Sequence, residues 1–373
     1  AGRHGIYYDV YDSGSQMNGT IAQNTIHHTS QYGIYLVFRY ARGTTSTVYV
    51  TDNEIYQTGS SSNYAGIYVS EYRNSTAFYA SGNHIHDNAG YGISVNESSY
   101  DGVYAEISDN QINGNGNTGI YLYGASLNPV VTLNRIYENY RGIYCYSGNY
   151  EGDFYYNDIH DNSGRVIDLN LSAGGNVNFN NIQGAEGYFA LYNQSGASLN
   201  ARYNYWGSSL TQEMDGGDNP KNISLIYDVY DDSSKGTVDY SGWLGTATAL
   251  PAASISRITS PLDGSKLKTQ LLKIKGVAVS PNGVKQVQIS LDNGTTWQDA
   301  SGTAAWVYNW ENPADGTYTL LSKIIDSDDN EETPGPGVSI EIDSSLPTTS
   351  GHLTGDETWS GTVTLTGDVP VPD

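Results

Sequence analysis

The chain has 373 residues, is rich in glycine (43) and tyrosine (33), and carries a formal net charge of −23 at pH 7. This length allows two or three domains with a large core. The acidic balance, with no lysine before Lys221, argues against a nucleic-acid or anionic-membrane partner, because phosphate binding requires clustered Lys and Arg. The sequence shows neither a signal peptide nor an apolar stretch long enough to insert into a membrane.

The first two thirds of the chain repeat two short apolar motifs. An Asn-x-Ile triplet recurs at intervals of 23 to 30 residues, and a Gly-Ile pair follows most triplets eight to thirteen residues later. Periods of this length predict a solenoid, and the abundance of turn formers and β-favouring aromatics predicts coils of short strands. The triplets begin at Asn24, Asn53, Asn83, Asn110, Asn134, Asn157 and Asn180, and the pairs begin at Gly5, Gly33, Gly66, Gly92, Gly119 and Gly142.

The repeat predicts which side chains enter the core of each coil. In Gly-Ile-Tyr-Leu-Val at 33–37, the alternation of a strand directs the Ile inward and the following Tyr outward. The triplet begins a second short strand whose Ile enters the same core. Coils stacked about 4.8 Å apart would align equivalent residues, so we expect core ladders of aliphatic residues and asparagine ladders that bond from coil to coil at the turns.

These motifs resemble a known family. Asn-x-Ile-[His/Tyr]-x-Asn followed by Gly-Ile-Tyr is similar to the right-handed parallel β-helix repeat, which occurs in periplasmic NosD-type proteins and in carbohydrate-binding or sugar-hydrolase modules. Residues 204–207, Asn-Tyr-Trp-Gly, and 237–244 resemble the aromatic closure of such domains. The resemblance implies a β-helix over residues 1–245 but no single function, because the fold carries lyases, epimerases, hydrolases, adhesins and structural fibres.

Tyrosine follows the Gly-Ile pair in most coils, and Ser94 interrupts the series. Stacking would align these tyrosines in a ladder on the exterior. Such a ladder offers rigid apolar rings with polar tips to sugars or to a neighbouring subunit, although tyrosine is also favoured at solvent-facing strand positions for its own sake. The ladder residues are Tyr7, Tyr35, Tyr68, Tyr121 and Tyr144.

Candidate catalytic residues are few. Arg141 and Arg165 occupy corresponding places in adjacent coils, before Gly-Ile and Val-Ile, and Asp168 is expected on the strand face that holds Tyr144. The resemblance implies that a polysaccharide lyase or epimerase would use a base such as Arg or Tyr near acids that bind calcium or neutralise uronates. The sequence shows no clustered acid pair, so these residues support a catalytic function only as an alternative.

Histidines occupy one repeat position, after the Ile of the triplet, at His27, His86 and His160. Tyr or Asn takes this place in other coils, which indicates an exposed turn position. His84 and His86 form His-x-His, but we find no third ligand at a suitable spacing, and the sequence therefore predicts no zinc or copper site. Cys145, the only cysteine, is expected to be an ordinary small strand residue.

Calcium is the one cofactor that the sequence suggests, because acidic turns supply the oxygen ligands that this ion prefers. None of these turns fits the EF-hand pattern, and charged loops are commonly only solvated. The candidates are Asp215 and Asp218 in the closing region of the solenoid, and Asp326, Asp328 and Asp329 in a later loop.

A second domain follows the solenoid. Residues 246–254 are small and uncharged and predict a linker. About seven short strands over 255–343 predict an antiparallel sandwich, which resembles a bacterial immunoglobulin-like module. Within it, the segment 290–297 resembles an Asp-box hairpin in which Asp292 stabilises the turn. Residues 344–373 are expected to be a β extension, similar to the opening of another β-helix module.

The sequence therefore predicts an all-β protein, built from a right-handed parallel β-helix, an immunoglobulin-like sandwich and a C-terminal extension. It favours a non-catalytic structural or adhesive protein at the cell surface or outside the cell. The expected partners are other copies of the chain, neighbouring surface proteins or polysaccharide. The alternative is a lyase, epimerase or hydrolase that acts on an acidic polysaccharide.

Overall fold

The computed structural model describes residues 2–10, 16, 18–39, 45–72, 75–98, 102–184 and 187–346. The chain divides into two compact units, residues 1–250 and 251–373. Strands dominate both units, as the sequence predicts. The predicted extension from residue 344 lies, after residue 346, outside the described residues.

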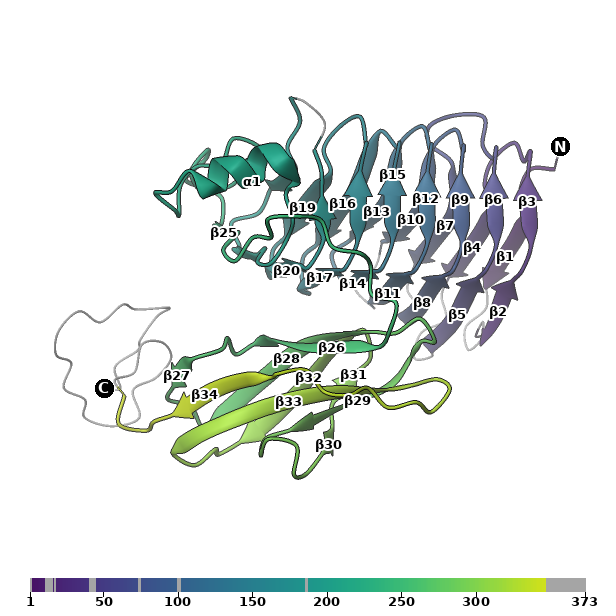
Figure 1. Cartoon of the computed structure of the whole chain (residues 1–373). Coiled ribbons are helices and arrows are strands. Elements are labelled where there is room, and N and C mark those ends of the chain that lie inside the picture. The colour runs from purple at the N-terminus through teal and green to yellow at the C-terminus, as the bar shows by residue number, and fades with distance from the viewer. Residues whose placement is uncertain are drawn as a thin grey trace, which may run out of the picture. The chain divides into compact units, whose positions relative to one another are not determined.

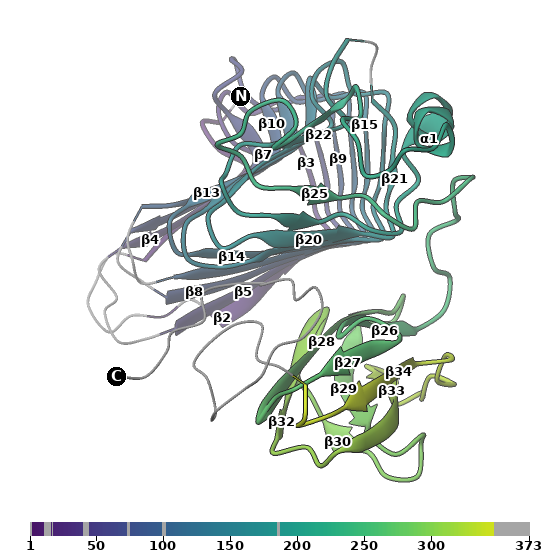
Figure 2. The ribbon, with the colours of Figure 1, turned by 90° about the vertical axis from the view of Figure 1, so that its left-hand side faces the viewer.

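The first unit is a parallel β-helix, whose coils build three sheets (Figures 1 and 2). Sheet 1 consists of β1 (Ile6–Val10), β4 (Ile34–Arg39), β7 (Ala65–Tyr72), β10 (Tyr91–Glu97), β13 (Thr118–Gly124), β16 (Arg141–Ser147), β19 (Ile167–Leu171), β22 (Leu191–Asn193) and β24 (Ile226–Tyr227). Sheet 2 consists of β2 (Asn18–Ala22), β5 (Thr45–Thr51), β8 (Ser75–Ser81), β11 (Val103–Ser108), β14 (Leu127–Thr132), β17 (Gly152–Tyr155), β20 (Gly175–Asn178), β23 (Leu199–Asn200) and β25 (Val238–Asp239). Sheet 3 consists of β3 (Thr25–His27), β6 (Glu54–Tyr56), β9 (His84–His86), β12 (Gln111–Asn113), β15 (Arg135–Tyr137), β18 (Asp158–His160) and β21 (Asn181–Ile182).

The two sequence motifs meet in the core. The Ile of each triplet lies in sheet 3 and is buried, and the Gly of each pair lies at the start of sheet 1 and packs on the Ile of the next coil. A Cβ atom added to Gly66 would lie 2.6 Å from Cγ2 of Ile85, and one added to Gly92 would lie 2.5 Å from Cγ2 of Ile112. Glycine is therefore required there, because any side chain would overlap a packed core residue.

The predicted asparagine ladder runs through the corner between sheets 2 and 3. Asn110, for example, donates from Nδ2 to Oδ1 of Asn134 (2.9 Å), while its own Oδ1 accepts from Nδ2 of Asn83 (2.9 Å). The same contacts link the ladder from Asn24 to Asn204. They satisfy the backbone groups that the turn leaves unpaired, which is the condition for burying such a corner.

The residue before each ladder asparagine adopts a left-handed backbone conformation, with φ between 53° and 66°. Bulky residues such as Leu133 and Phe179 (φ 60° and 61°) rarely adopt it, so the surrounding corner must impose it on them. Near the end of the unit the side chains of these residues stack outside the corner: the rings of Tyr156 and Phe179 lie 5.2 Å apart, and those of Phe179 and Tyr203 5.4 Å.

One short helix lies beside the last coils (Figure 1), and buried aromatic side chains join the core there. Trp206 is buried, as the predicted aromatic closure requires, and α1 (Gly207–Asp215) follows it at once. Leu210 and Met214 lie one turn apart on α1 and join the same core. The helix covers apolar surface that an open coil would leave in water.

The second unit consists of two sheets around their own core, in agreement with the predicted sandwich. One sheet is ordered β26 (Ile255–Ser260), β28 (Leu271–Val279), β32 (Ala305–Glu311) and β31 (Ser301–Gly302). The other is ordered β27 (Ser265–Leu267), β34 (Val338–Ile342), β33 (Gly316–Asp326), β29 (Val284–Ser290) and β30 (Gln298–Asp299). Neighbouring strands are antiparallel, except that β27 and β34 are parallel.

The Asp-box turn forms as predicted. The carboxylate of Asp292 accepts hydrogen bonds from the backbone N–H of Thr296 (2.8 Å), from its hydroxyl (2.7 Å) and from the hydroxyl of Ser290 (2.8 Å). These bonds, led by the Thr296 N–H, lower the pKa of the Asp292 carboxyl to about 2. The Asp box is thus a turn-stabilising element.

Candidate functional sites on the β-helix

The five predicted tyrosines form a ladder on the outward face of sheet 1. Strand register pairs Tyr7 with Tyr35, Tyr35 with Tyr68, and Tyr121 with Tyr144. The ring centres in these three pairs lie 5.3, 5.3 and 5.2 Å apart. Tyr7 is 50% exposed and the others are half-buried. The rings contact one another, so the ladder presents mainly ring edges and hydroxyl groups to solvent.

At Ser94, where the ladder lacks a tyrosine, a neighbouring tyrosine supplies a ring that was not among the predicted ladder residues. Ser94 pairs with Tyr68 and Tyr121 in the register and is only 1% exposed. Tyr91, three residues earlier, places its ring 4.9 Å from that of Tyr121. The side chain of Tyr91 therefore continues the aromatic surface past the gap.

A second aromatic column flanks the ladder at the residue before Gly-Ile. Tyr32 lies 4.7 Å from the ring of Tyr35 and 4.6 Å from that of Tyr68, and His4 lies 5.1 Å from Tyr35. The signal was present in the sequence, because His4, Tyr32 and Tyr91 all precede a Gly-Ile pair. With this column the ladder becomes a surface more than one residue wide.

The hydroxyl groups of this surface are neutral at physiological pH. Burial raises the pKa of Tyr121 to about 12, and it raises the pKa values of Tyr32, Tyr35, Tyr68 and Tyr144 above the ordinary value as well. Each hydroxyl can therefore both donate and accept a hydrogen bond, which suits neutral polyhydroxyl ligands.

The structure brings the candidate catalytic residues together at one end of the ladder. Asp168 takes the ladder position after Tyr144 in the register and is fully buried. Its Oδ2 accepts from Nη1 of Arg165 (2.9 Å) and Nη1 of Arg141 (3.4 Å), and its Oδ1 accepts from Nε2 of Gln194. Both carboxylate oxygens are thus engaged inside the protein, an arrangement that anchors the two guanidinium groups beside the tyrosines.

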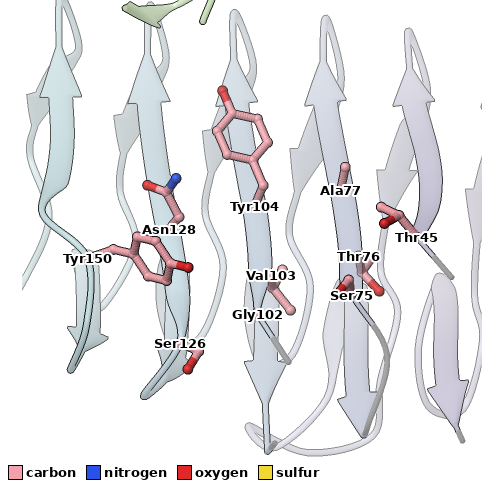
Figure 3. Close-up of a pocket in the computed structure, with 10 residues that line it drawn as sticks. All are labelled: Thr45, Ser75, Thr76, Ala77, Gly102, Val103, Tyr104, Ser126, Asn128 and Tyr150. Carbon is pink, nitrogen blue, oxygen red and sulfur yellow. The ribbon is translucent and has the colours of Figure 1, made fainter. Parts of the chain in front are cut away.

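A shallow groove lies on a different face, along the first residues of the sheet 2 strands (Figure 3). Its volume is about 220 Å³. Tyr104 and Tyr150 line it together with the polar side chains of Thr45, Ser75 and Asn128. The groove combines rings with hydroxyl and amide groups, so it is a second surface on which a sugar could be held.

Two of the three predicted calcium residues in the second unit, Asp326 and Asp329, are engaged by other residues of that unit. Asp326 accepts from the backbone N–H groups of Asp328 (3.0 Å) and Asn330 (2.8 Å) and from Nδ2 of Asn282 (3.0 Å). These bonds, led by that of Asn282, lower the pKa of the Asp326 carboxyl. Asp329 pairs with Lys285. The carboxylate of Asp326 thus holds its own loop, and that of Asp329 forms an ion pair with β29.

The other two calcium candidates lie at the end of α1, where Asp215 is its last residue, and just after it. Asp215 accepts a hydrogen bond from Nε1 of Trp243 (2.8 Å) and is exposed, and Asp218 is exposed with φ 60°. Within the described ranges, neither belongs to a group of three or more His, Cys, Asp or Glu side chains with ligand atoms within 4.8 Å of one another.

One such group does occur among the described residues, and it includes the third ligand that the sequence was not expected to supply beside His84 and His86. Glu54, His84 and His86 each place a ligand atom within 4.8 Å of the others. Glu54 was missed although the repeat places it, because it is the middle residue of the triplet Asn53-Glu54-Ile55, as His84 is of Asn83-His84-Ile85. The pairing of β6 with β9 brings the two side chains together.

Comparison with known proteins matches residues 3–210 to the family model described as periplasmic copper-binding protein (NosD). The chain belongs to the NosD family. The match covers the repeats of the β-helix, and a second match, to the bacterial Ig domain, covers residues 256–321. Both agree with the resemblances that the repeat and the strand pattern suggest.

Other comparisons add little to the NosD assignment. A search among curated proteins finds no match. Among solved structures, the fibronectin(III)-like modules of Clostridium thermocellum CbhA are 22% identical over 24% of this chain and 97% of that one, with a TM-score of 0.22. No helix in the described part of the chain is long and apolar enough to cross a membrane.

The NosD description names copper, so the possible metal-ligand atoms of this chain can be compared with the ligands that copper ions prefer. The group of Glu54, His84 and His86 offers imidazole nitrogen and carboxylate oxygen, a set that fits Cu²⁺ or Zn²⁺ better than Cu⁺, which prefers sulfur ligands. Cys145 is buried in the core, and burial raises its pKa, so it is not an accessible thiolate.

Proposed function

We propose that this protein is a non-catalytic, extracellular or cell-surface β-helix protein that binds polysaccharide along the tyrosine ladder of sheet 1. The observation that carries the proposal is the aromatic surface itself, in which Tyr7, Tyr35, Tyr68, Tyr121 and Tyr144 are aligned with ring centres just over 5 Å apart within their contacting pairs. A polysaccharide is a linear polymer with a regular repeat, so successive sugar units can contact successive tyrosines of the ladder.

The chemistry of the ladder supports a sugar ligand. Ring edges and neutral phenol groups offer apolar contact and hydrogen bonding side by side, the combination that sugar rings present in return. The net charge of −23 makes a strongly anionic polymer an unfavourable ligand, because like charges repel over the Debye length. We therefore propose a neutral or weakly charged polysaccharide.

The end of the ladder beyond Tyr144 also suits the binding of a polysaccharide. Arg165 lies over the ring of Tyr192, with 3.7 Å from Cζ to the ring centre, and Asp168 holds Arg141 beside it. The side chains of Arg141 and Arg165 are about one-third exposed. They supply N–H donors beside the aromatic surface, where they can donate hydrogen bonds to the hydroxyl oxygens of a bound glycan.

The proposal is tested with a panel of soluble polysaccharides and three single variants. Tyr121→Ser changes a ladder residue to the one that the repeat already uses at Ser94, so the fold should tolerate it. Tyr49→Ser is the control, since Tyr49 is a 42% exposed ring stacked on Tyr79 on sheet 2. Tyr150→Ser tests the groove.

We expect binding to a neutral polymer that weakens about fivefold in Tyr121→Ser, which corresponds to a loss of about 1 kcal/mol for one aromatic contact. Tyr49→Ser and Tyr150→Ser should bind like the native chain. Loss in Tyr150→Ser alone would move the site to the groove, and no binding across the panel would reject the proposal. Turnover of a uronate polymer that is lost in Arg141→Ala would favour the enzymatic alternative.

A further inference from the structure

A group of metal-ligating side chains lies on the outward face of sheet 3, separate from the tyrosine ladder. His84 and His86 flank the buried Ile85 on β9, so the alternation of the strand points both imidazoles outward. The register pairs His84 with Glu54 of β6, on the neighbouring coil. One ligand atom from each of the three side chains lies within 4.8 Å of the others.

Hydrogen bonds to the imidazoles leave one nitrogen of each ring available. Nδ1 of His86 donates to Oδ2 of Asp87 (2.9 Å), and Nε2 of His84 donates to Oδ1 of Asn113 (3.2 Å). Such donation to a carboxylate or amide oxygen leaves a lone pair on the other ring nitrogen and fixes the orientation of the ring, as the outer partners of metal-bound histidines do.

The free nitrogen of His86 lacks a partner within the protein. Its Nε2 is buried and accepts no hydrogen bond, and the nearest carboxylate oxygen, Oε1 of Glu54, is 3.9 Å away. A buried nitrogen without a partner is costly unless something occupies the space beside it. A cation between Nε2 of His86 and the carboxylate of Glu54 would satisfy both groups.

The neighbouring residues hold the imidazoles in place. The ring of His86 stacks on Tyr56 of β6, with 5.1 Å between centres and 10° between planes, and the rings of His84 and His86 lie 4.1 Å apart. The side chain of His86 is only 17% exposed, whereas that of Glu54 is 50% exposed. The nitrogen side of the group is therefore rigid, and the carboxylate side is open to solvent.

We propose that Glu54, His84 and His86 bind one divalent transition-metal ion, Cu²⁺ or Zn²⁺. Two imidazoles and one carboxylate are the ligands that these ions share, and the group contains no sulfur donor that would favour Cu⁺. These three protein ligands, one of which is the exposed carboxylate of Glu54, leave coordination positions on the ion open to water or to a small ligand. The site does not depend on polysaccharide binding.

The test uses the full chain and the metal ions alone. The variant His84→Gln/His86→Asn gives β9 the sequence Gln-Ile-Asn, which is that of the neighbouring strand β12, so the coil should fold unchanged. Glu54→Gln removes the third ligand. His160→Asn is the matched control, because His160 occupies the repeat position of His86 and stacks on Tyr137 in the same way (5.2 Å), without a second imidazole on its strand.

Calorimetric titration with Cu²⁺ and with Zn²⁺ should show one tight site per chain in the native protein and in His160→Asn. The double variant should lose more than about 100-fold in affinity, and Glu54→Gln about tenfold or more, since removing even an outer partner of a ligand costs about 10- to 100-fold. The electron paramagnetic resonance spectrum of bound Cu²⁺ should show coupling to imidazole nitrogen.

Two results would overturn the assignment. One is a native chain that binds neither ion above the weak, multiple binding expected of an acidic surface. The other is tight binding that survives in both the double variant and Glu54→Gln. Circular dichroism of each variant, compared with the native chain, separates loss of the site from loss of the fold.

Discussion

The side chain of a ladder asparagine such as Asn110 joins three successive coils. Asn110 donates to the carbonyl of Ala80 in the preceding coil (2.9 Å) and to Oδ1 of Asn134 in the following one (2.9 Å), while the backbone N–H of Asn83 donates to Asn110 (3.0 Å). These groups are buried, so a group that lost its hydrogen-bond partner could not bond to water instead. One amide thus fixes the backbone of a turn and the spacing of its neighbours.

Replacing such a residue should destabilise the β-helix strongly. We expect Asn110→Ala to lower the free energy of unfolding by about 3 kcal/mol, because it leaves several buried polar groups unpaired. Asn24→Ala, at the less buried start of the ladder, should cost clearly less. Urea unfolding followed by circular dichroism measures both. Equal and small losses would show that the ladder is not a source of stability.

At the scale of one element, the Asp-box hairpin shows how a local motif predicts both a structure and a pH dependence. The pKa of the Asp292 carboxyl is about 2, below the ordinary value of 3.8, because N–H and O–H groups of Thr296 donate to the ionised form. Stability from this group is present in full above pH 3.8 and is lost as the pH falls through about 2.

The immunoglobulin-like unit should therefore lose stability between pH 4 and pH 2 in a manner that depends on Asp292. We expect the urea midpoint, followed by tryptophan fluorescence, to fall further over this interval in the native chain than in Asp292→Asn, which has no carboxyl to titrate. Other carboxyl groups titrate in both proteins, so the difference isolates Asp292. Parallel curves would show that the turn bonds do not favour the ionised form.

Elements that the sequence repeat or a local motif marks could be predicted. Elements whose conformation depends on their packing in the folded chain could not. The Gly-Ile and Asn-x-Ile motifs predict sheets 1 and 3 because each motif fills a fixed place in every coil. Helix α1 has only Leu210 and Met214 as its apolar face, too few to show a helical period. The left-handed residues Leu133 and Phe179 follow no residue preference, because the asparagine corner imposes their conformation.

At the scale of the whole molecule, register decides which distant residues become neighbours. The alignment of the tyrosines follows directly from the repeat, so the ladder could be predicted. Glu54 and His84 hold the same position, the middle of the Asn-x-Ile triplet, in adjacent coils, so the repeat already pairs them. The sequence prediction missed the pair because it considered ligand spacing along the chain and not between stacked coils. Tyr91 could likewise have been predicted, because it precedes a Gly-Ile pair as Tyr32 does, and its ring contacts that of Tyr121 next to the gap at Ser94.

The central claim is that polysaccharide lies on sheet 1, and hydroxyl-radical footprinting read by mass spectrometry tests it most directly. With a polymer that the chain binds, oxidation of Tyr7 and Tyr121 should fall, while oxidation of Tyr49 on sheet 2, which is 42% exposed, should stay unchanged. Protection of Tyr49 or Tyr150 with no change at Tyr7 and Tyr121 would contradict the claim and place the ligand on sheet 2.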